Sequence, residues 1–229
     1  MNEQEEVLKI LGRVGAVITN SHIVYTSGKH GKSYINKDAI YPHTHLTSML
    51  CSAIALEFSA KEFLVDVVIA PAIGAVVLSQ WVAYHLTNLV EHEVLGVYAE
   101  KEGTELISSS YGPLSPKHED KFVIKRGYDK ILEGKRVLVV EDVLTTGGSV
   151  KKVIEATRAT GGGVVGLGVL CNRGGITSKD VANPPKLFSL VNVKLDAWDE
   201  EVCPLCANNI PINTDVGKGR EYLARKKAS

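Results

Sequence analysis

The hydrophobic positions of the chain fall into short continuous runs and longer periodic segments that succeed one another regularly. Residues 3–14 place apolar side chains at the spacing of an amphipathic helix. Residues 16–36 carry two apolar arms around a Ser-Gly-Lys-His segment, which predicts a hairpin. Short β-branched runs then predict strands at 65–70, 96–100, 122–125, 137–142 and 164–171, and periodic segments predict helices at 46–61, 75–89 and 150–160.

This alternation of strands and helices predicts a parallel sheet. Right-handed crossovers join consecutive parallel strands, so the helices are expected to cover the faces of the sheet. The sequence shows no internal repeat and no interdomain linker. We therefore expect a single α/β domain over residues 1–229, with a parallel, Rossmann-like sheet flanked by helices.

The most informative segment covers residues 136–150, Arg-Val-Leu-Val-Val-Glu-Asp-Val-Leu-Thr-Thr-Gly-Gly-Ser-Val. A buried strand ends at Glu141 and Asp142, and a turn of Thr, Gly and Ser then opens a helix. Backbone N–H groups and the dipole at a helix start hold phosphate, and neighbouring carboxylates bind ribose hydroxyls or, through water, Mg²⁺. The segment thus predicts a sugar-phosphate site. The alternative, an ordinary strand and N-capped helix, gives the two acids no packing purpose.

Composition and charge agree with a small-molecule ligand. The chain has 229 residues, 45% of them hydrophobic, which is enough for one large core. Lys plus Arg and Asp plus Glu both number 26, so no net field attracts nucleic acid or a membrane surface. No apolar run reaches the length of a membrane span, and the acidic residues 1–6 do not resemble a secretory signal. We expect a cytoplasmic protein.

Four cysteines, at positions 51, 171, 203 and 206, leave a metal site as a minor alternative. Only Cys203 and Cys206 have ligand-like spacing, and a zinc site needs two further ligands. Cys171 and the scattered histidines show no second paired motif. We expect a reduced pair on a surface turn, and a thioredoxin-type role is still less favoured because no strand directly precedes the pair.

Four segments together resemble the type I phosphoribosyltransferases, and among them the orotate phosphoribosyltransferases, over about residues 14–173. They are the phosphoribosyl pyrophosphate motif within 136–150, residues 26–37, residues 70–74 and residues 172–174. The first motif is specific, whereas the others discriminate only in combination. The resemblance implies the type I phosphoribosyltransferase fold, with a small hood built from residues 1–40 and 183–229, a mobile active-site loop, and Mg²⁺ as cofactor.

Position in the fold supports a site at these segments, because ligands of open parallel sheets lie beyond the carboxyl ends of the strands. The resemblance implies that Glu141 and Asp142 hold the ribose and Mg²⁺, through water or ribose hydroxyls, and that Lys101 joins them in catalysis. For the loop after the strand at 65–70, a tight βα turn is the alternative. The residues implied in binding phosphoribosyl pyrophosphate are Ala72, Ile73, Gly74, Lys101, Lys125, Arg126, Glu141, Asp142, Val143, Leu144, Thr145, Thr146, Gly147, Gly148 and Ser149.

The polar stretch 102–122 is rich in Ser, Gly and Pro and lacks a clear period, which is typical of an active-site lid. In the family, a mobile loop here closes over the substrates and brings basic side chains to the pyrophosphate. In this chain the basic cluster is reduced to Lys101, with Lys117, His118 and Lys121 farther along. Solvated surface charges are the alternative for each.

The residues implied in binding the base are Lys29, Tyr34, Ile35, Thr145 and Arg173. The planar fork of Arg173 suits a carboxylate or a pyrimidine carbonyl edge, and a salt bridge at a strand end is its alternative. Tyr34 and Ile35 replace the aromatic pair of many relatives, and Thr26 stands where some have lysine. These departures leave the identity of the base open more than the type of reaction.

The resemblance implies Mg²⁺-dependent transfer of the 5-phosphoribosyl group from phosphoribosyl pyrophosphate to orotate, giving orotidine 5′-monophosphate and pyrophosphate. Because the accepting nitrogen belongs to an already anionic base, catalysis rests on positioning and electrostatics. A purine or another pyrimidine as acceptor is one alternative. A non-catalytic regulator is another, although no DNA-binding helix-turn-helix or basic arm is evident. The family also implies a homodimer.

Overall fold

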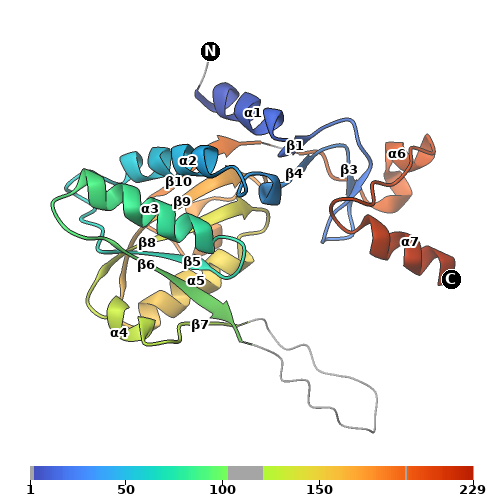
Figure 1. The fold of residues 1–229 in the computed structure, drawn as a ribbon. Helices are drawn as coiled ribbons and strands as arrows, with labels where there is room; N and C mark the ends of the chain where they lie inside the picture. The colour runs from blue at the N-terminus through green and yellow to red at the C-terminus, as the bar shows by residue number, and fades with distance from the viewer. Residues whose placement is uncertain (1–2, 103–120, 194, 229) are drawn as a thin grey trace, which may run out of the picture.

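A six-stranded sheet forms the centre of the molecule in the computed structural model, which describes residues 3–102, 121–193 and 195–228 (Figure 1). The strand order is β10-β9-β8-β5-β6-β7, and all neighbours are parallel except the antiparallel edge strand β7. This confirms the predicted parallel sheet. The strands are β5 (Val67–Pro71), β6 (Leu95–Lys101), β7 (Phe122–Val123), β8 (Arg136–Leu144), β9 (Gly163–Asn172) and β10 (Leu187–Asn192).

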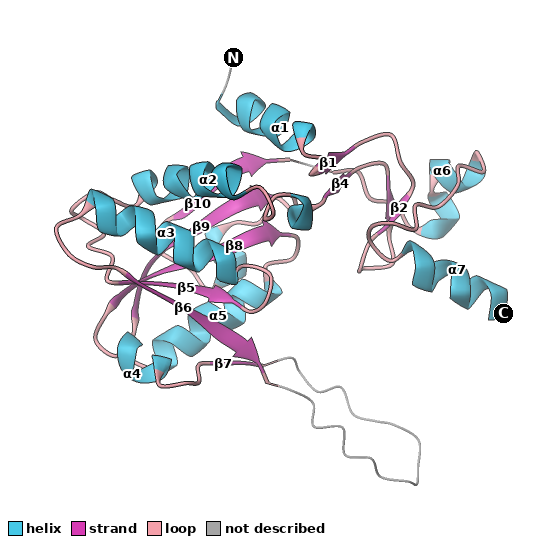
Figure 2. Ribbon diagram, in the orientation of Figure 1, coloured by secondary structure: helices cyan, strands magenta, loops and turns pink. Residues whose placement is uncertain are grey.

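Helices cover both faces of this sheet, as Figure 2 shows. Successive strand residues point to opposite faces, so Val68 and Val140 belong to one hydrophobic cluster and Val67 and Val139 to the other. The first cluster packs under α2 (Thr44–Glu57) and α3 (Val76–Leu89), with α1 (Glu3–Arg13) beside β10, and the second under α4 (Tyr128–Leu132) and α5 (Gly148–Ala159). The continuous apolar runs of the strands follow from burial on both faces.

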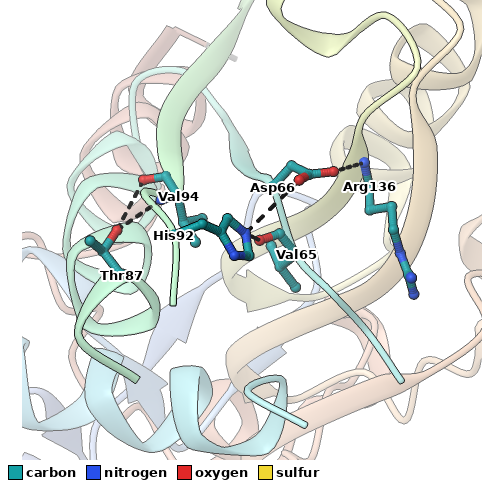
Figure 3. A network of polar contacts seen from close by, with 6 residues as sticks. All are labelled: Val65, Asp66, Thr87, His92, Val94 and Arg136. Carbon is teal, nitrogen blue, oxygen red and sulfur yellow. Dashed lines mark hydrogen bonds and ion pairs between the residues drawn. The ribbon is translucent and has the colours of Figure 1, made fainter. Parts of the chain in front are cut away.

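The amino ends of the central strands are tied together by a polar network (Figure 3). Asp66 Oδ2 accepts a hydrogen bond of 2.8 Å from the backbone N–H of Arg136, and His92 Nε2 lies 3.0 Å from the carbonyl oxygen of Val65. The Thr87 hydroxyl accepts a 2.9 Å bond from the N–H of Val94. The network fixes the starts of β5, β6 and β8, at the edge opposite their carboxyl ends.

A separate small layer lies beside the carboxyl ends of the strands, and we call residues 15–35 and 195–228 the hood. Its strands β1 (Val17–Ile18) and β4 (Tyr34–Ile35) pair with each other, as do β2 (Ile23–Val24) and β3 (His30–Gly31). The C-terminal part closes on the second pair, because His30 and Trp198 exchange two backbone hydrogen bonds of 2.8 Å. Its helices are η3 (Glu200–Val202), α6 (Pro204–Ala207) and α7 (Gly219–Ala228).

The structure differs from the sequence prediction mainly in its C-terminal quarter. Residues 187–192, expected in the hood, form β10 and pair in parallel with β9 inside the main sheet. Helix α7, α4 and the short helices η1 (Lys37–Ala39) and η2 (Ser178–Val181) were not predicted. Most of the expected lid, residues 103–120 with Lys117 and His118, lies outside the described residues. Among the described helices, none is both long and apolar enough to cross a membrane.

Candidate active site

Glu141 and Asp142 lie inside β8, which extends to Leu144 rather than ending at the acidic pair. Both residues are buried, with 7% and 5% of their surface exposed. The two carboxylates line different pockets. Glu141 lines the pocket formed by the turn that follows, and Asp142 lines a polar pocket next to the hood.

The turn after β8 forms a pocket of about 150 Å³, lined by Glu141 and residues 143–150. Helix α5 starts here with Gly147 as its N-cap, and Gly147 supplies no side-chain hydrogen bond to the first helical N–H groups. The φ of Gly147 is +75°, and a Cβ there would lie 2.5 Å from Val181 Cγ1. Only glycine fits this turn, which leaves the amide donors available to an anion.

Lys37, two residues after the hood strand β4, contacts the acidic pair. Its ammonium forms an ion pair with Asp142 Oδ2. Gly74, from the loop after β5, passes so close that a Cβ there would overlap Lys37 Nζ and lie 2.7 Å from Asp142 Oδ2. The Ala72–Ile73 peptide of the same loop is cis. Three segments distant in sequence therefore meet at one carboxylate.

Burial shifts the proton affinities of these groups. The pKa of Glu141 is raised well above its usual range by burial and then by the negative charge of Asp142. Burial lowers the pKa of Lys37, but the charge and hydrogen bond of Asp142 and the negative charges of Asp38 and Glu141 together raise it more, so the net shift is upward. Lys37 thus stays charged and compensates Asp142, while Glu141 lacks an equivalent partner.

A cationic pocket adjoins the acidic pair on the hood side. Arg173 follows β9, and its backbone N–H donates to the carbonyl oxygen of Leu144 at 3.0 Å. Its guanidinium lies over the ring of Tyr25 at 4.7 Å and near that of Tyr34 at 5.8 Å. In the described part of the chain no carboxylate forms an ion pair with Arg173, so the strand-end salt bridge considered above is not found there.

The pockets share lining residues with one another. Arg173 lines a cavity of about 120 Å³ together with Lys37, Asp142 and the predicted base-binding residues Tyr34, Ile35 and Thr145. It also lines a wider cavity of about 630 Å³ that reaches Ser27 and Ala197 of the hood. Thr145 lines both of these cavities and the pocket of the turn. The anion pocket, the two carboxylates and the cationic pocket are therefore neighbours, with Thr145 lining each of the three cavities.

Other predicted residues lie apart from these pockets. Lys29 is not among their lining residues: its ammonium pairs with Asp199 at 3.2 Å, and both side chains are exposed. Lys101 is exposed at the end of β6. Arg126 Nε donates a 2.6 Å hydrogen bond to Glu100, which precedes Lys101 in β6. Lys125, next to Arg126 in sequence, is exposed. These three basic residues lie at the carboxyl end of β6 rather than in the three pockets.

Lys37 and Tyr25 were not predicted as site residues, although both lie within or next to the segments that carry the resemblance. A tyrosine before the Thr-Ser-Gly turn and a lysine after Tyr-Ile-Asn are the available signals. Asn172 is a third addition. Its side chain donates to the carbonyl oxygen of Ile176 at 2.8 Å and accepts from the Ile176 N–H at 3.0 Å, which holds the loop that carries Arg173.

Comparisons with known proteins agree with this geometry. A model of the phosphoribosyl transferase domain matches residues 38–204. The orotate phosphoribosyltransferases of Thermoanaerobacter sp. and Caldanaerobacter subterraneus subsp. tengcongensis are 36% and 34% identical over 210 residues, covering 92% of this chain and 95% of each relative.

Solved structures share the fold at lower identity. The orotate phosphoribosyltransferase of Aeropyrum pernix is 24% identical, with a TM-score of 0.58 over 81% of this chain and 93% of that one. The adenine phosphoribosyltransferase of Thermoanaerobacter pseudethanolicus is 20% identical, with a TM-score of 0.57 over 81% of this chain and 99% of that one. The same fold thus occurs in enzymes named for different bases.

Proposed function

The chain belongs to the orotate phosphoribosyltransferases of the phosphoribosyl transferase family, and we propose that it transfers 5-phosphoribosyl from phosphoribosyl pyrophosphate to orotate. The products are orotidine 5′-monophosphate and pyrophosphate. The observation that carries the proposal is that Thr145 lines all three pockets, so that the anion pocket, the two carboxylates and the pocket of Arg173 lie together.

Each part of the substrate has a chemically suitable neighbour in the proposed binding mode. The 5′-phosphate takes the pocket at the start of α5, where amide donors and the helix dipole favour an anion. The ribose hydroxyls donate to Glu141 and Asp142. The base then enters the pocket of Arg173 and Tyr34, where the guanidinium binds the carboxylate that distinguishes orotate from uracil.

The proposed reaction exchanges one bond at C1 of the ribose for another. The bond from C1 to the pyrophosphate oxygen breaks with its electron pair on the leaving pyrophosphate, and the orotate ring nitrogen supplies the pair for the new bond. Positive charge develops on the ribose between these events, as in glycoside hydrolysis. Glu141 and Asp142 orient the ribose, and Lys101 and Arg126 are proposed to contact the pyrophosphate.

The donor set of the site fits Mg²⁺. Two adjacent buried carboxylates are oxygen ligands of the type this cation prefers, and a bound cation would offset the burial and the neighbouring negative charge that raise the pKa of Glu141. In the proposal, Glu141 and Asp142 hold Mg²⁺ through water or ribose hydroxyls. When bound, the ion supplies positive charge that neutralises the pyrophosphate oxygens.

The proposal extends to the assembly and location of the enzyme. We infer a homodimer, as the family resemblance implies, with residues 102–122 as a lid that excludes competing water. A cytoplasmic location follows from the substrate, because a multiply charged sugar pyrophosphate does not cross membranes unaided. Sedimentation equilibrium tests the dimer, and a monomer at micromolar concentration contradicts it.

Orotate-dependent pyrophosphate release tests the function directly, with adenine, hypoxanthine and uracil offered in place of orotate. We expect turnover with orotate and none with the other three bases. Turnover with a purine or with uracil instead would revise the assigned acceptor base but leave the assignment as a phosphoribosyltransferase unchanged. Binding of phosphoribosyl pyrophosphate without turnover of any base would show a regulator and overturn the enzyme assignment.

A further inference from the structure

Four potential metal ligands converge inside the hood, away from the pockets of the active site. They are His22 before β2, His30 in β3, and Cys203 and Cys206 at α6, and one ligand atom of each lies within 4.8 Å of all the others. His22, His30 and Cys203 are buried, with 2%, 0% and 2% of their surface exposed. Two histidines and two cysteines form a donor set typical of structural zinc sites.

The distances between these atoms fit a tetrahedral site. His22 Nε2 lies 2.9 Å from His30 Nδ1, and the Cys206 sulfur lies 3.3 Å from His30 Nδ1 and 3.7 Å from His22 Nε2. The Cys203 sulfur lies 3.8 Å from His22 Nε2. Ordinary Zn–N and Zn–S bonds give tetrahedral edges of about 3.3 Å between nitrogens and about 3.5 Å between nitrogen and sulfur.

The surroundings of His22 orient it as a ligand. Its other ring nitrogen, Nδ1, lies 2.7 Å from the carbonyl oxygen of Ile210, so a proton on Nδ1 leaves Nε2 unprotonated and facing the cluster. Metal-bound histidines commonly donate their second N–H to a carbonyl in this way. Two thiolates balance the charge of a divalent ion, and a neutral complex can be buried at low cost.

The hood also needs a source of stability other than apolar burial. The two hydrophobic clusters of the described residues contain no side chain from residues 20–31 or 195–228. Apart from glycines, the buried residues of this part of the hood are the two histidines and Cys203, with Ile23, Val24 and Tyr25. Small units with so little core commonly depend on a metal or disulfides.

We propose that His22, His30, Cys203 and Cys206 bind one Zn²⁺ ion that joins the N-terminal hairpin of the hood to its C-terminal tail. All four positions are protein ligands, so the site is closed and structural rather than catalytic. It lies outside the proposed reaction. It revises the expected surface pair, because the two missing ligands are histidines eight residues apart on a hairpin, more than 170 residues away from the cysteines in sequence.

The first test is the metal content of untagged wild-type protein purified without chelator. We expect one equivalent of zinc per chain by plasma mass spectrometry. Replacement by Co²⁺ is expected to give the visible d–d bands of a tetrahedral ion and a thiolate charge-transfer band. Protein with neither zinc nor a cobalt spectrum would overturn the site, and a full equivalent of iron would overturn the assignment to zinc.

Matched variants assign the ligands. Cys206→Ala and His22→Ala are expected to lose the zinc, whereas Cys51→Ala, in the main core, and His45→Ala, on the exposed side of α2, retain a full equivalent. If the ligand variants fail to fold, the cobalt spectrum of wild-type protein still tests whether cysteine thiolates bind the metal. Retention of zinc by a folded Cys206→Ala variant, or a Cys203–Cys206 disulfide in the wild-type protein, would contradict the proposal.

Discussion

Individual side chains at the end of β8 show how the site trades stability for binding. Asp142 has its compensating cation in Lys37, whereas Glu141 is buried with a raised pKa, and within the described part of the chain its Oε1 accepts a hydrogen bond of 3.0 Å from the N–H of Asp142. A group held in this way is ready to accept hydrogen bonds from ribose hydroxyls. The cost of burying Glu141 in the free protein is therefore expected to be measurable.

Glu141→Gln is predicted to stabilise the protein at neutral pH. A carboxyl with a raised pKa makes the folded chain bind more protons, so the free energy of unfolding falls as pH rises above the ordinary value of 4.5. Glutamine removes that loss and keeps the oxygen that faces the Asp142 N–H. The gain is about 1.4 kcal/mol for each unit by which the pKa is raised.

Urea unfolding across this pH range measures the effect, with exposed Glu133→Gln as the control. The curves of wild-type and Glu141→Gln protein should converge below pH 4.5 and separate above it, while the control follows the wild type. Parallel curves at all pH values would show that Glu141 is not destabilised in the folded state. The variant should also lose activity.

Arg173→Ala is predicted to weaken orotate binding specifically. Hydrogen bonds to a charged group contribute about 1.5–3 kcal/mol, which corresponds to a rise of about 10- to 100-fold in the KM for orotate. The KM for phosphoribosyl pyrophosphate should change little. Arg158→Ala is the control, since Arg158 bonds the carbonyl oxygen of Asn183 at 3.2 Å, outside the pockets. An unchanged KM for orotate would remove Arg173 from the base site.

At the scale of elements, the junction between β8 and α5 is the part that sequence alone identifies best. A buried strand, two acids and a small-residue turn are contiguous, so local pattern was sufficient to predict both the element and its chemistry. The same reasoning selected Lys29 for the base site and did not identify Lys37 as a site residue. Both belong to the segment 26–37 that carries part of the resemblance, but only the three-dimensional path of the chain brings Lys37 to Asp142 and leaves Lys29 with Asp199.

Strand β10, in contrast, could not be predicted from the local sequence. Its sequence, Leu-Phe-Ser-Leu-Val-Asn, follows two prolines and a region without a clear pattern, and its partner β9 has already formed a complete βαβ unit. Nothing local distinguishes an edge strand of the sheet from part of a tail. Pairing with β9 and cover from α1 decide the matter, and both are contacts over long sequence separations.

Gly147→Ala is predicted to damage the phosphate turn more than any comparable change elsewhere. At a φ of +75°, alanine costs about 1 kcal/mol, and the methyl group would also press on Val181 at 2.5 Å. Displacement of the turn should raise the Kd for phosphoribosyl pyrophosphate at least about tenfold, if it disturbs one charge-assisted hydrogen bond.

Gly134→Ala isolates the backbone contribution. Gly134 has a φ of +68°, and a Cβ there meets nothing within 4 Å. Calorimetric titration should show unchanged binding for this control and weakened binding for Gly147→Ala, while thermal unfolding reports similar backbone strain in both. Equal affinities for the two variants would mean that the turn does not hold the phosphate.

At the scale of the whole molecule, the main sheet and the hood obtain their stability from different sources. The sheet has two apolar clusters, whereas residues 20–31 and 195–228 of the hood lie outside both clusters and rely on backbone pairing and on the proposed zinc site. Removal of zinc should therefore loosen the hood by local unfolding and leave the sheet intact.

Hydrogen exchange measured with and without a strong chelator tests this prediction. Amides of residues 20–31 and 195–228 should exchange faster after chelation, while those of β5, β8 and β9 keep their protection. Faster exchange across the entire sheet would instead indicate one cooperative unit, and no change in the hood would separate its stability from the metal.

The closure of the hood also has a consequence for the order of events during synthesis. Residues 17–31 are made early, yet Asn213, whose N–H donates to the His22 carbonyl oxygen at 2.7 Å, and Trp198, which pairs with His30, are made near the end. A nascent chain grows by about 5–20 residues per second, so the sheet strands are synthesised after the hairpin and before its C-terminal partners. On the ribosome, the hood is therefore the last part of the enzyme to be completed.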